Sequence, residues 1–571
     1  MSSKTSVNPL LMGASIPDLR RKLGGARGTL GKYWSHFLAL ARGDAEWYGL
    51  YQPLAYIVTG DAGFKKAARA AFLKYADLVP EGDVSLEAQV HTHVVSAPLA
   101  HWAILYDWAC GSGILRPAER EHVAGALLAQ AQKFPMQQVQ GRTRGYDNQV
   151  FSNAFACTAV GYVLGCRRGD DPLARRMLGL GLAWVRALFD DLPADGYTLE
   201  GSTYHEQVSM PVTLWATALY EEATGQAVFE TPFGPHGVSV RDMVEYSCNM
   251  ISPAGLVPPW DAYGHQKASV RSFLVYLARR TGNPEPLRII RDTRMWDRMA
   301  HPAWECHDRM WALAWWPEHL DWEHEAPAYR PWIGTKTAGA LNDRATRTRL
   351  FQYWDECGGL AYSGRTEVNP NAISLEAFGS PVILDGGVKG AETLTPIPVD
   401  TVLDYAGRDF VGRLADSWGL QGPDRLERAA KRCVDGNVGI SNSLHFDHED
   451  WYVPVNPVHG AGGGCHDLGA FQTLTADACD YYTDRYDVTR VLRTSAMLAG
   501  RWCLVRDRVT AASDHAVTWQ AFIPADAARD GAAVYGTVPT GVGLAVVPDA
   551  ALETDIAAAP VFPNHLDVYA E

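Results

Sequence analysis

The chain has 571 residues, which is more than one hydrophobic core usually supports, so we expect two large domains. Hydrophobic residues make up 47% of the sequence and charged residues 20%, and this balance excludes a disordered protein. The formal net charge of −14, without a long run of Lys and Arg, excludes nucleic acid as a partner and disfavours a long polyanion held over a wide surface.

The amino-terminal stretch MSSKTSVNPLLMGASIPDLRRK lacks the apolar core of a secretion signal, and no segment has the roughly 20 apolar residues of a membrane span. We therefore expect no membrane partner, and a cytoplasmic location for the chain as given or a periplasmic or secreted one after processing. The ten cysteines form no CxxC pair, which predicts free buried thiols instead of a zinc ribbon or a disulfide framework. The sequence makes no prediction of oligomeric state.

Apolar residues recur at helical spacing from about residue 30 to about residue 330, as in FKKAARAAFLKYADLV and REHVAGALLAQAQKF. Loops such as TGDAG and TGNPEP interrupt this pattern, because Gly, Pro and Asp supply turn geometry. Many helices of similar length joined by short loops indicate hairpins packed in series. A closed ring of hairpins is one solution, and a solenoid or a bundle gives the same pattern.

A first polar cluster in this region is AQVHTHVVSAPLAHW, which contains His91, His93 and His101. If the segment is helical, the three side chains do not share one face, so a zinc site is not expected and at most one or two of them point into a cleft.

A second polar cluster is GRTRGYDNQVFSNAF, residues 141–155, at the start of an otherwise apolar helix. So many donors beside a helix start suit an anionic ligand. The alternative is a solvated loop in which Asp147 or Asn148 caps the helix. The polar residues of the cluster are Arg142, Arg144, Asn148, Gln149 and Asn153.

The segment LPADGYTLEGSTYHEQVSM, residues 192–210, places Tyr204 and His205 side by side where the chain enters a predicted helix. Such a pair can face a cavity. The alternative is that Ser202 caps the helix and Tyr204 is merely buried. Further along, Tyr263 and His265 lie in the loop LVPPWDAYGHQK, which we expect to reach a cleft.

The pattern changes near residues 335–350 to short runs typical of strands, bounded by turn residues. These runs are RLFQYW, ISLEAFGSPVILDGG, LERAAKRCVDGNVGISNSLHF, GAFQTLTA, RWCLVRDRV and HAVTWQAFIP. Frequent Gly and Asp between them predict an antiparallel sandwich.

The run DGYTLEGSTYHEQ resembles the signature of the heparinase II/III superfamily of polysaccharide lyases, in which an acidic residue and Ser precede a Tyr-His pair. Arg142 and Asn148 are similar to the arginine and the neutralising asparagine of its heparinase III-like branch. LAHWAILYDWA, SLEAFGSPVILDGG and VLRTSAMLAGRWCLVRDRV extend the resemblance over most of the chain.

The resemblance implies a multidomain α+β fold with an (α/α) toroid of helical hairpins over residues 1–335. It implies an antiparallel β-sandwich over residues 336–571, an active cleft between the two domains, and an acidic poly- or oligosaccharide containing uronate as the partner. One departure concerns the sandwich, because Asn369 and Asn371 stand where the family usually has the histidines of a His-x-His-x-Asp stretch. We therefore predict no metal, although the segment with His459, His466 and Asp467 can supply a histidine by another route.

The chemistry implied is β-elimination. The C5 proton of a uronate is weakly acidic beside the carboxylate, so the enzyme must neutralise that carboxylate and stabilise the enolate. Asn148 and Arg142 are the candidates for this role. A base must take the C5 proton and an acid must protonate O4. Tyr204 can do both if the two groups are syn, and its role as base requires that Arg142 or a protonated His lower its pKa from the usual value of about 10. If they are anti, a second residue is required, and His205, His93 and Tyr263 are the candidates.

The predicted catalytic residues are therefore Asn148, Tyr204, His205 and Arg142, with no cofactor required. Two alternatives stay open: a glycoside hydrolase on the same toroid, which needs two carboxylic acids, and a non-catalytic glycan-binding homologue. The predicted substrate-binding residues are His93, Gln149, Arg144, Glu200, Tyr263, His265 and Asn369.

Overall fold

The chain forms two compact units in the computed structural model. The first comprises residues 1–196, 206–245 and 269–327, and the second comprises residues 197–205, 246–268 and 328–571. The domain boundary expected between residues 335 and 336 stays a prediction. The structure describes residues 10, 12–43, 51–78, 93–133, 148–194, 196, 205–258, 266–298, 305–335, 338–354, 371–383, 400, 403, 408, 411–412, 415, 421–435, 444–447, 462–469, 471–482, 486–519, 521, 523 and 526–548.

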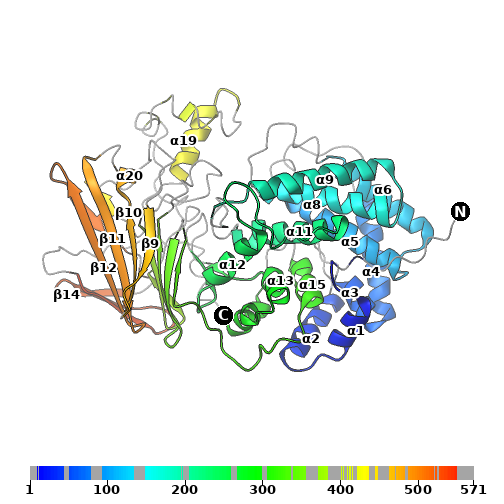
Figure 1. Cartoon of the computed structure of the whole chain (residues 1–571), viewed down its shortest axis with the longest axis horizontal. Helices are drawn as coiled ribbons and strands as arrows, with labels where there is room; N and C mark the ends of the chain where they lie inside the picture. The colour runs from blue at the N-terminus through cyan, green and yellow to red at the C-terminus, as the bar shows by residue number, and fades with distance from the viewer. Residues whose placement is uncertain are drawn as a thin grey trace. The chain divides into compact units, whose positions relative to one another are not determined.

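The first unit consists of helices, as the apolar spacing predicts (Figure 1). No helix in the described ranges is long and apolar enough to span a membrane. The helices, with three short π- or 3₁₀-turns (η), are α1 Ile16–Gly24, α2 Gly28–Arg42, α3 Gln52–Thr59, α4 Ala62–Leu78, α5 His93–Gly111, α6 Pro117–Ala131, α8 Asn148–Tyr162, η1 Val163–Arg167, α9 Pro172–Asp190, η2 His205–Ser209, α11 Met210–Thr224, α12 Val240–Met250, α13 Ser272–Thr281, α14 Glu285–Asp292, η3 Met295–Asp297 and α15 Glu305–Trp315.

Helix ends in this unit follow from local sequence. Asp171 caps α9, because its carboxylate accepts hydrogen bonds from the backbone N–H groups of the first turn. The helices α3, α11 and α13 stop at Gly60, Gly225 and Gly282, whose φ angles of 74°, 71° and 70° lie in the left-handed region that glycine adopts without strain. The predicted turns TGDAG and TGNPEP are thereby confirmed.

The second unit is built on two antiparallel sheets whose inner faces share one apolar core. Side chains of Leu341, Leu350 and Leu375 come from one sheet and pack with Leu474 and Val491 of the other. The five-stranded sheet has the order β3 Trp332–Gly334, β4 Ala338–Asp343, β5 Thr348–Tyr353, β6 Ile373–Ala377 and β7 Ser380–Ile383. The four-stranded sheet has the order β12 Trp502–Ala511, β11 Val488–Leu498, β10 Gln472–Asp477 and β9 Gly462–Asp467.

Smaller elements complete this unit. They are the pair β1 Leu256–Val257 with β2 Gln266–Lys267, the pair β8 Leu444–Phe446 with β13 Val517–Trp519, the sheet β14 Asp526–Asp530, β15 Ala533–Thr537 and β16 Gly543–Val546, and the helices α19 Arg425–Asp435 and α20 Cys479–Tyr482.

One predicted strand run is wrong in its first half. LERAAKRCVDGNVGISNSLHF begins with the helix α19, and among its described residues the last three, Leu444–Phe446, form a strand. Leu, Glu, Arg, Ala and Lys are strong helix formers, and the ion pair between Asp424 and Arg428 supports the first turn. The other runs contain the strands that the sequence predicts.

Candidate functional site

Helices α5 and α8 of the first unit run in the same direction. The rings of His101 and Phe155 meet near the middle of the two helices, with centroids 5.3 Å apart. Further along α5, the carboxylate of Asp107 binds the guanidinium groups of Arg167 and Arg168, which follow the end of α8. Later residues of α5 thus contact later residues of α8 and of the segment that follows it. The carboxyl ends of the two helices therefore lie at the same end of the unit.

Helices α11 and α13 share this direction. The hydroxyl of Tyr162, at the end of α8, donates to the carbonyl of Glu222 near the end of α11. The carboxylate of Glu221 in turn accepts from Tyr276 and Arg280 near the end of α13. The carboxyl ends of α8, α11 and α13 therefore lie together.

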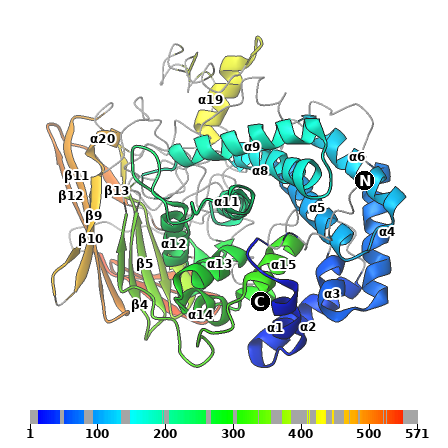
Figure 2. The same cartoon turned by 45° about the vertical axis from the view of Figure 1, so that its right-hand side comes forward.

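Helix α15 completes the set, because His101 and Trp108 of α5 contact its His307 and Trp311 in the same order. Figures 1 and 2 show α5 and α8 side by side within the helical unit. We call α5, α8, α11, α13 and α15 the parallel helices. Their amino ends share one end of the unit, where each helix dipole contributes roughly half a positive charge. This end is the candidate site, since it favours an anionic ligand.

Three predicted site residues begin these helices. His93 is the first residue of α5, Asn148 is the first residue of α8, and His205 opens the π-turn η2 that runs directly into α11. A π-turn at the start of a helix is an uncommon local structure that occurs frequently at functional sites. The side chains of His93, Asn148 and Gln149 lie outside the described set, so only their positions along the helices are known.

The imidazole of His205 is fully buried, and this residue is the last one of a segment of the second unit, directly before the chain re-enters the first unit at Glu206. Its Nε2 lies 2.7 Å from the hydroxyl of Ser247, and its ring meets that of Tyr246 edge-on at 5.7 Å. Burial lowers the pKa of His205 to about 3, so the ring is neutral at neutral pH.

Polar side chains are also buried where the parallel helices meet. His101 stacks on His307 with ring centroids 4.0 Å apart and lies edge-on to Trp215 of α11. Its Nδ1 donates to the carbonyl of Ala97, so Nε2 carries no proton. Burial lowers the pKa of His101 to about 3 and holds that of His307 well below its ordinary value.

A buried ion pair fixes two of the amino ends. The carboxylate of Asp308 in α15 accepts from the backbone N–H groups of Arg271 and Ser272 at 2.9 and 2.7 Å, at the start of α13. It also pairs with the guanidinium of Arg271, and both side chains are fully buried. One carboxylate therefore caps α13 and ties it to α15.

Several predicted site residues lie outside the described residues, so no geometry is known for them. They are Arg142, Arg144, Glu200, Tyr204, Tyr263, His265 and Asn369, and His459 of the proposed replacement segment lies there too.

The sequence reasoning missed Ser247, His307 and Asp308. A signal for the last two was available, because helical spacing puts His307 and Asp308 on the same face as Trp311 of the apolar run MWALAWW that follows them, and buried polar side chains need partners. No comparable signal marks Ser247, whose contact with His205 joins residues far apart in sequence.

Asn371, one of the two residues found where the family has histidines, has a structural role in the sandwich. It is buried with a φ of 59°, and its side chain donates to the carbonyls of Ala476 and Val491 at 3.1 Å. Its own carbonyl accepts from Arg493 at 2.7 Å. Asn371 therefore links β10 and β11 to the start of β6.

His466 is exposed on β9, and within the described part of the chain no group of His, Cys, Asp and Glu has the arrangement of a metal site.

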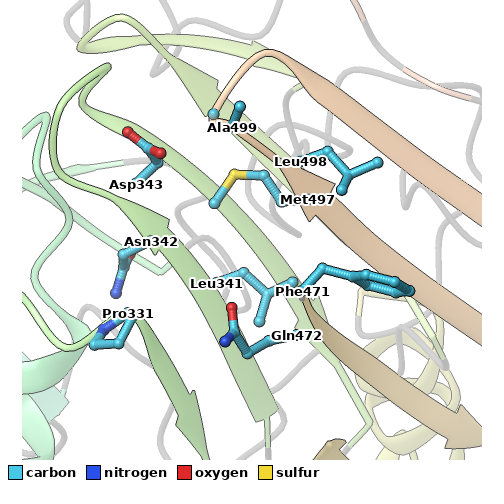
Figure 3. Close-up of a pocket in the computed structure, with 10 residues that line it drawn as sticks. Pro331, Leu341, Asn342, Asp343, Phe471, Gln472, Met497, Leu498 and Ala499 are labelled. Atoms are coloured by element: carbon cyan, nitrogen blue, oxygen red, sulfur yellow. The ribbon is translucent and has the colours of Figure 1, made fainter. Parts of the chain in front are cut away.

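The sandwich also contains a small pocket of about 130 Å³ (Figure 3). Asn342 and Asp343 of β4 and Gln472 of β10 supply its polar groups, and Leu498 lies at its side. The volume is below that of a typical ligand pocket, and none of the predicted site residues lines it.

Comparisons with known proteins identify the fold. No protein-family model matches the chain, and no curated protein matches it. Among solved structures, a mutant of the heparan sulfate lyase HepC from Pedobacter heparinus matches with a TM-score of 0.51 and 13% identity, over 91% of this chain and 69% of that chain. A heparinase III matches with a TM-score of 0.49 and 10% identity, over 94% of this chain and 77% of that chain. The chain has a heparinase-like fold, an (α/α) toroid followed by an antiparallel β-sandwich, as the sequence predicts.

Proposed function

We propose that the protein is a polysaccharide lyase that cleaves a uronic-acid-containing glycan by β-elimination. The observation that carries this proposal is the position of His93, Asn148 and His205 at the amino ends of helices in a heparinase-like toroid. Parallel helix dipoles at that end favour an anionic group such as the uronate carboxylate.

In the proposed reaction, Asn148 and Arg142 neutralise the uronate carboxylate and thereby make the C5 proton more acidic. Tyr204, as the phenolate that the positive charge of Arg142 favours, takes this proton and, for syn groups, donates it to O4 as the glycosidic bond breaks. The neutral, buried His205 is a poor proton donor at neutral pH, so its proposed role is to orient Tyr204 through its bond to Ser247. His93, Gln149, Arg144, Glu200, Tyr263, His265 and Asn369 are proposed to bind the substrate.

The test uses a panel of uronate glycans: heparan sulfate, alginate, glucuronan and chondroitin. Elimination produces a conjugated double bond that absorbs ultraviolet light, and we expect one glycan to give this signal. Asn148→Ala is expected to lower kcat by about 100-fold to 1,000-fold, the usual effect of removing one preorganised donor. Asn283→Ala, an exposed asparagine in the loop before α14, is the matched control and should leave kcat unchanged.

Two results would contradict the proposal. New reducing ends without ultraviolet absorbance would identify a hydrolase. Equal kcat values for Asn148→Ala and Asn283→Ala would remove Asn148 from the reaction.

A further inference from the structure

The outward face of the four-stranded sheet is distinct from the candidate site. Val509 and Ala511 of β12 pack against the sandwich core, so the residues that alternate with them point away from it. We call this the outer sheet face. It is formed by Trp502, Leu504, Arg506 and Arg508 of β12 with Leu498 and Arg490 of β11.

One end of the outer sheet face is apolar. Trp502 is 72% exposed, Leu504 is 62% exposed, and Leu498, the cross-strand partner of Trp502, is 47% exposed. Large apolar side chains gathered in this way on a surface mark a binding area more often than isolated ones do. A flat, exposed indole suits the apolar face of a sugar ring.

The other end of the outer sheet face is basic. Arg506 and Arg508 are exposed, and Arg490 lies one cross-strand diagonal from Arg508. None of the three has an ion-pair partner among the residues that the structure describes. The carboxylate of Asp477, on β10, already accepts backbone hydrogen bonds from Cys479 and Val491. Three neighbouring guanidinium groups thus stand on a chain with a net charge of −14.

The hairpin that presents Trp502 is held in place. Its turn contains Ala499 and Gly500 with φ angles of 50° and 61°, which suit the twist of a tight β-hairpin. The carbonyl of Gly500 accepts from the hydroxyl of Thr348 at 2.8 Å and from that of Thr346 at 3.3 Å. The indole is therefore exposed on a backbone that is already held in place. As a result, less conformational entropy of this hairpin is lost when a ligand binds.

We propose that the outer sheet face binds the acidic polysaccharide outside the site of cleavage. Trp502 and Leu504 pack on a sugar ring, while the guanidinium groups of Arg506, Arg508 and Arg490 pair with carboxylates or sulfates farther along the chain. Trp502 and Arg508 are about 20 Å apart at the rise of a β-strand, so the ligand is a chain of several sugars. The identity of the glycan rests on the proposed function, and the binding itself does not require turnover.

A second copy of the protein is a less suitable occupant. Pairing two outer sheet faces in parallel would bring guanidinium groups against guanidinium groups, which opposes association, and an antiparallel pairing would bury the guanidinium groups of each copy against the apolar end of the other without a charged partner.

The experiment measures binding of the full chain to heparin and to uncharged dextran by calorimetry at low salt. The double variant Arg506→Ser with Arg508→Ser removes two charges from the outer sheet face, and Trp502→Ala tests the aromatic contact. The matched control Lys66→Ser with Arg176→Ser removes two exposed charges from the helical unit. Binding to the glycan is read directly, so it is tested even if no lyase activity is found.

We expect heparin affinity to fall about tenfold in the double arginine variant and in Trp502→Ala, with no change in the control and no binding to dextran. An equal fall in the control would show that net charge alone drives binding, and this overturns the proposal. Unchanged affinity in both face variants overturns it as well. A dimer that Trp502→Ala dissociates, without an effect on heparin affinity, would assign the face to self-association instead.

Discussion

Buried histidines give the helical unit a dependence on acid. His101 has a pKa of about 3 in the folded chain and about 6.5 in the unfolded chain, because burial disfavours the charged ring. Between these values the unfolded state binds more protons than the folded state. Stability is therefore full above about pH 6.5 and is lost as the pH falls toward 3.

We predict that His101→Gln removes part of this acid sensitivity. The free energy of unfolding lost between pH 7 and pH 5 should shrink by about 2 kcal/mol, since a single histidine contributes about 1.4 kcal/mol per pH unit below its unfolded pKa. Urea unfolding followed by circular dichroism measures this loss. His122→Gln, an exposed histidine that pairs with Asp77, is the control. An unchanged acid loss in His101→Gln would show that His101 is protonated in the folded chain.

A second prediction at this scale concerns Asp308. Replacing it with Ala leaves the buried guanidinium of Arg271 and two backbone N–H groups of α13 without their partner. The free energy of unfolding should fall by about 3–5 kcal/mol. Asp190→Ala, which removes an exposed pair with Arg186, should change it by less than about 1 kcal/mol. Equal losses in the two variants would contradict a capping role for Asp308.

Among the secondary-structure elements, the predicted helices and strands are mostly confirmed because their signals are local. Turn glycines such as Gly60 and Gly282 end helices through their own backbone conformation, which does not depend on contacts with distant residues. The prediction for α19 was wrong because its helix-forming residues were grouped in one run with the strand Leu444–Phe446 that follows them. The common direction of the parallel helices could not be predicted, because it depends on contacts between residues far apart in sequence, such as Asp107 with Arg167.

The turn residue Asn371, just before β6, supports a further prediction. Its side chain holds the carbonyls of β10 and β11, and its φ of 59° is one that Asn tolerates better than Ala. Asn371→Ala should therefore lower the free energy of unfolding of the sandwich by about 2–4 kcal/mol. Thr489→Ala, at an exposed position of β11, should have little effect. Urea titration of the two variants decides the point, and matching midpoints would show that Asn371 does not join the strands.

At the scale of the whole molecule, the sequence motifs predicted the fold and a set of site residues. The fold is confirmed, whereas the site is known only in part, because Arg142 and Tyr204 lie outside the described residues. The geometry adds what the motifs could not contain: the shared amino ends of the parallel helices, the bond between His205 and Ser247, and the outer sheet face. A fold shared at 13% identity does not by itself determine a reaction.

The most direct test of the central claim is the mass of the products formed from a defined uronate oligosaccharide. β-Elimination splits the chain without consuming water, so we predict that the masses of the two products sum to the mass of the substrate. Tyr204→Phe, which lacks the hydroxyl that moves the proton, should form neither product at a measurable rate. A sum larger by one water molecule would show hydrolysis and contradict the proposed function.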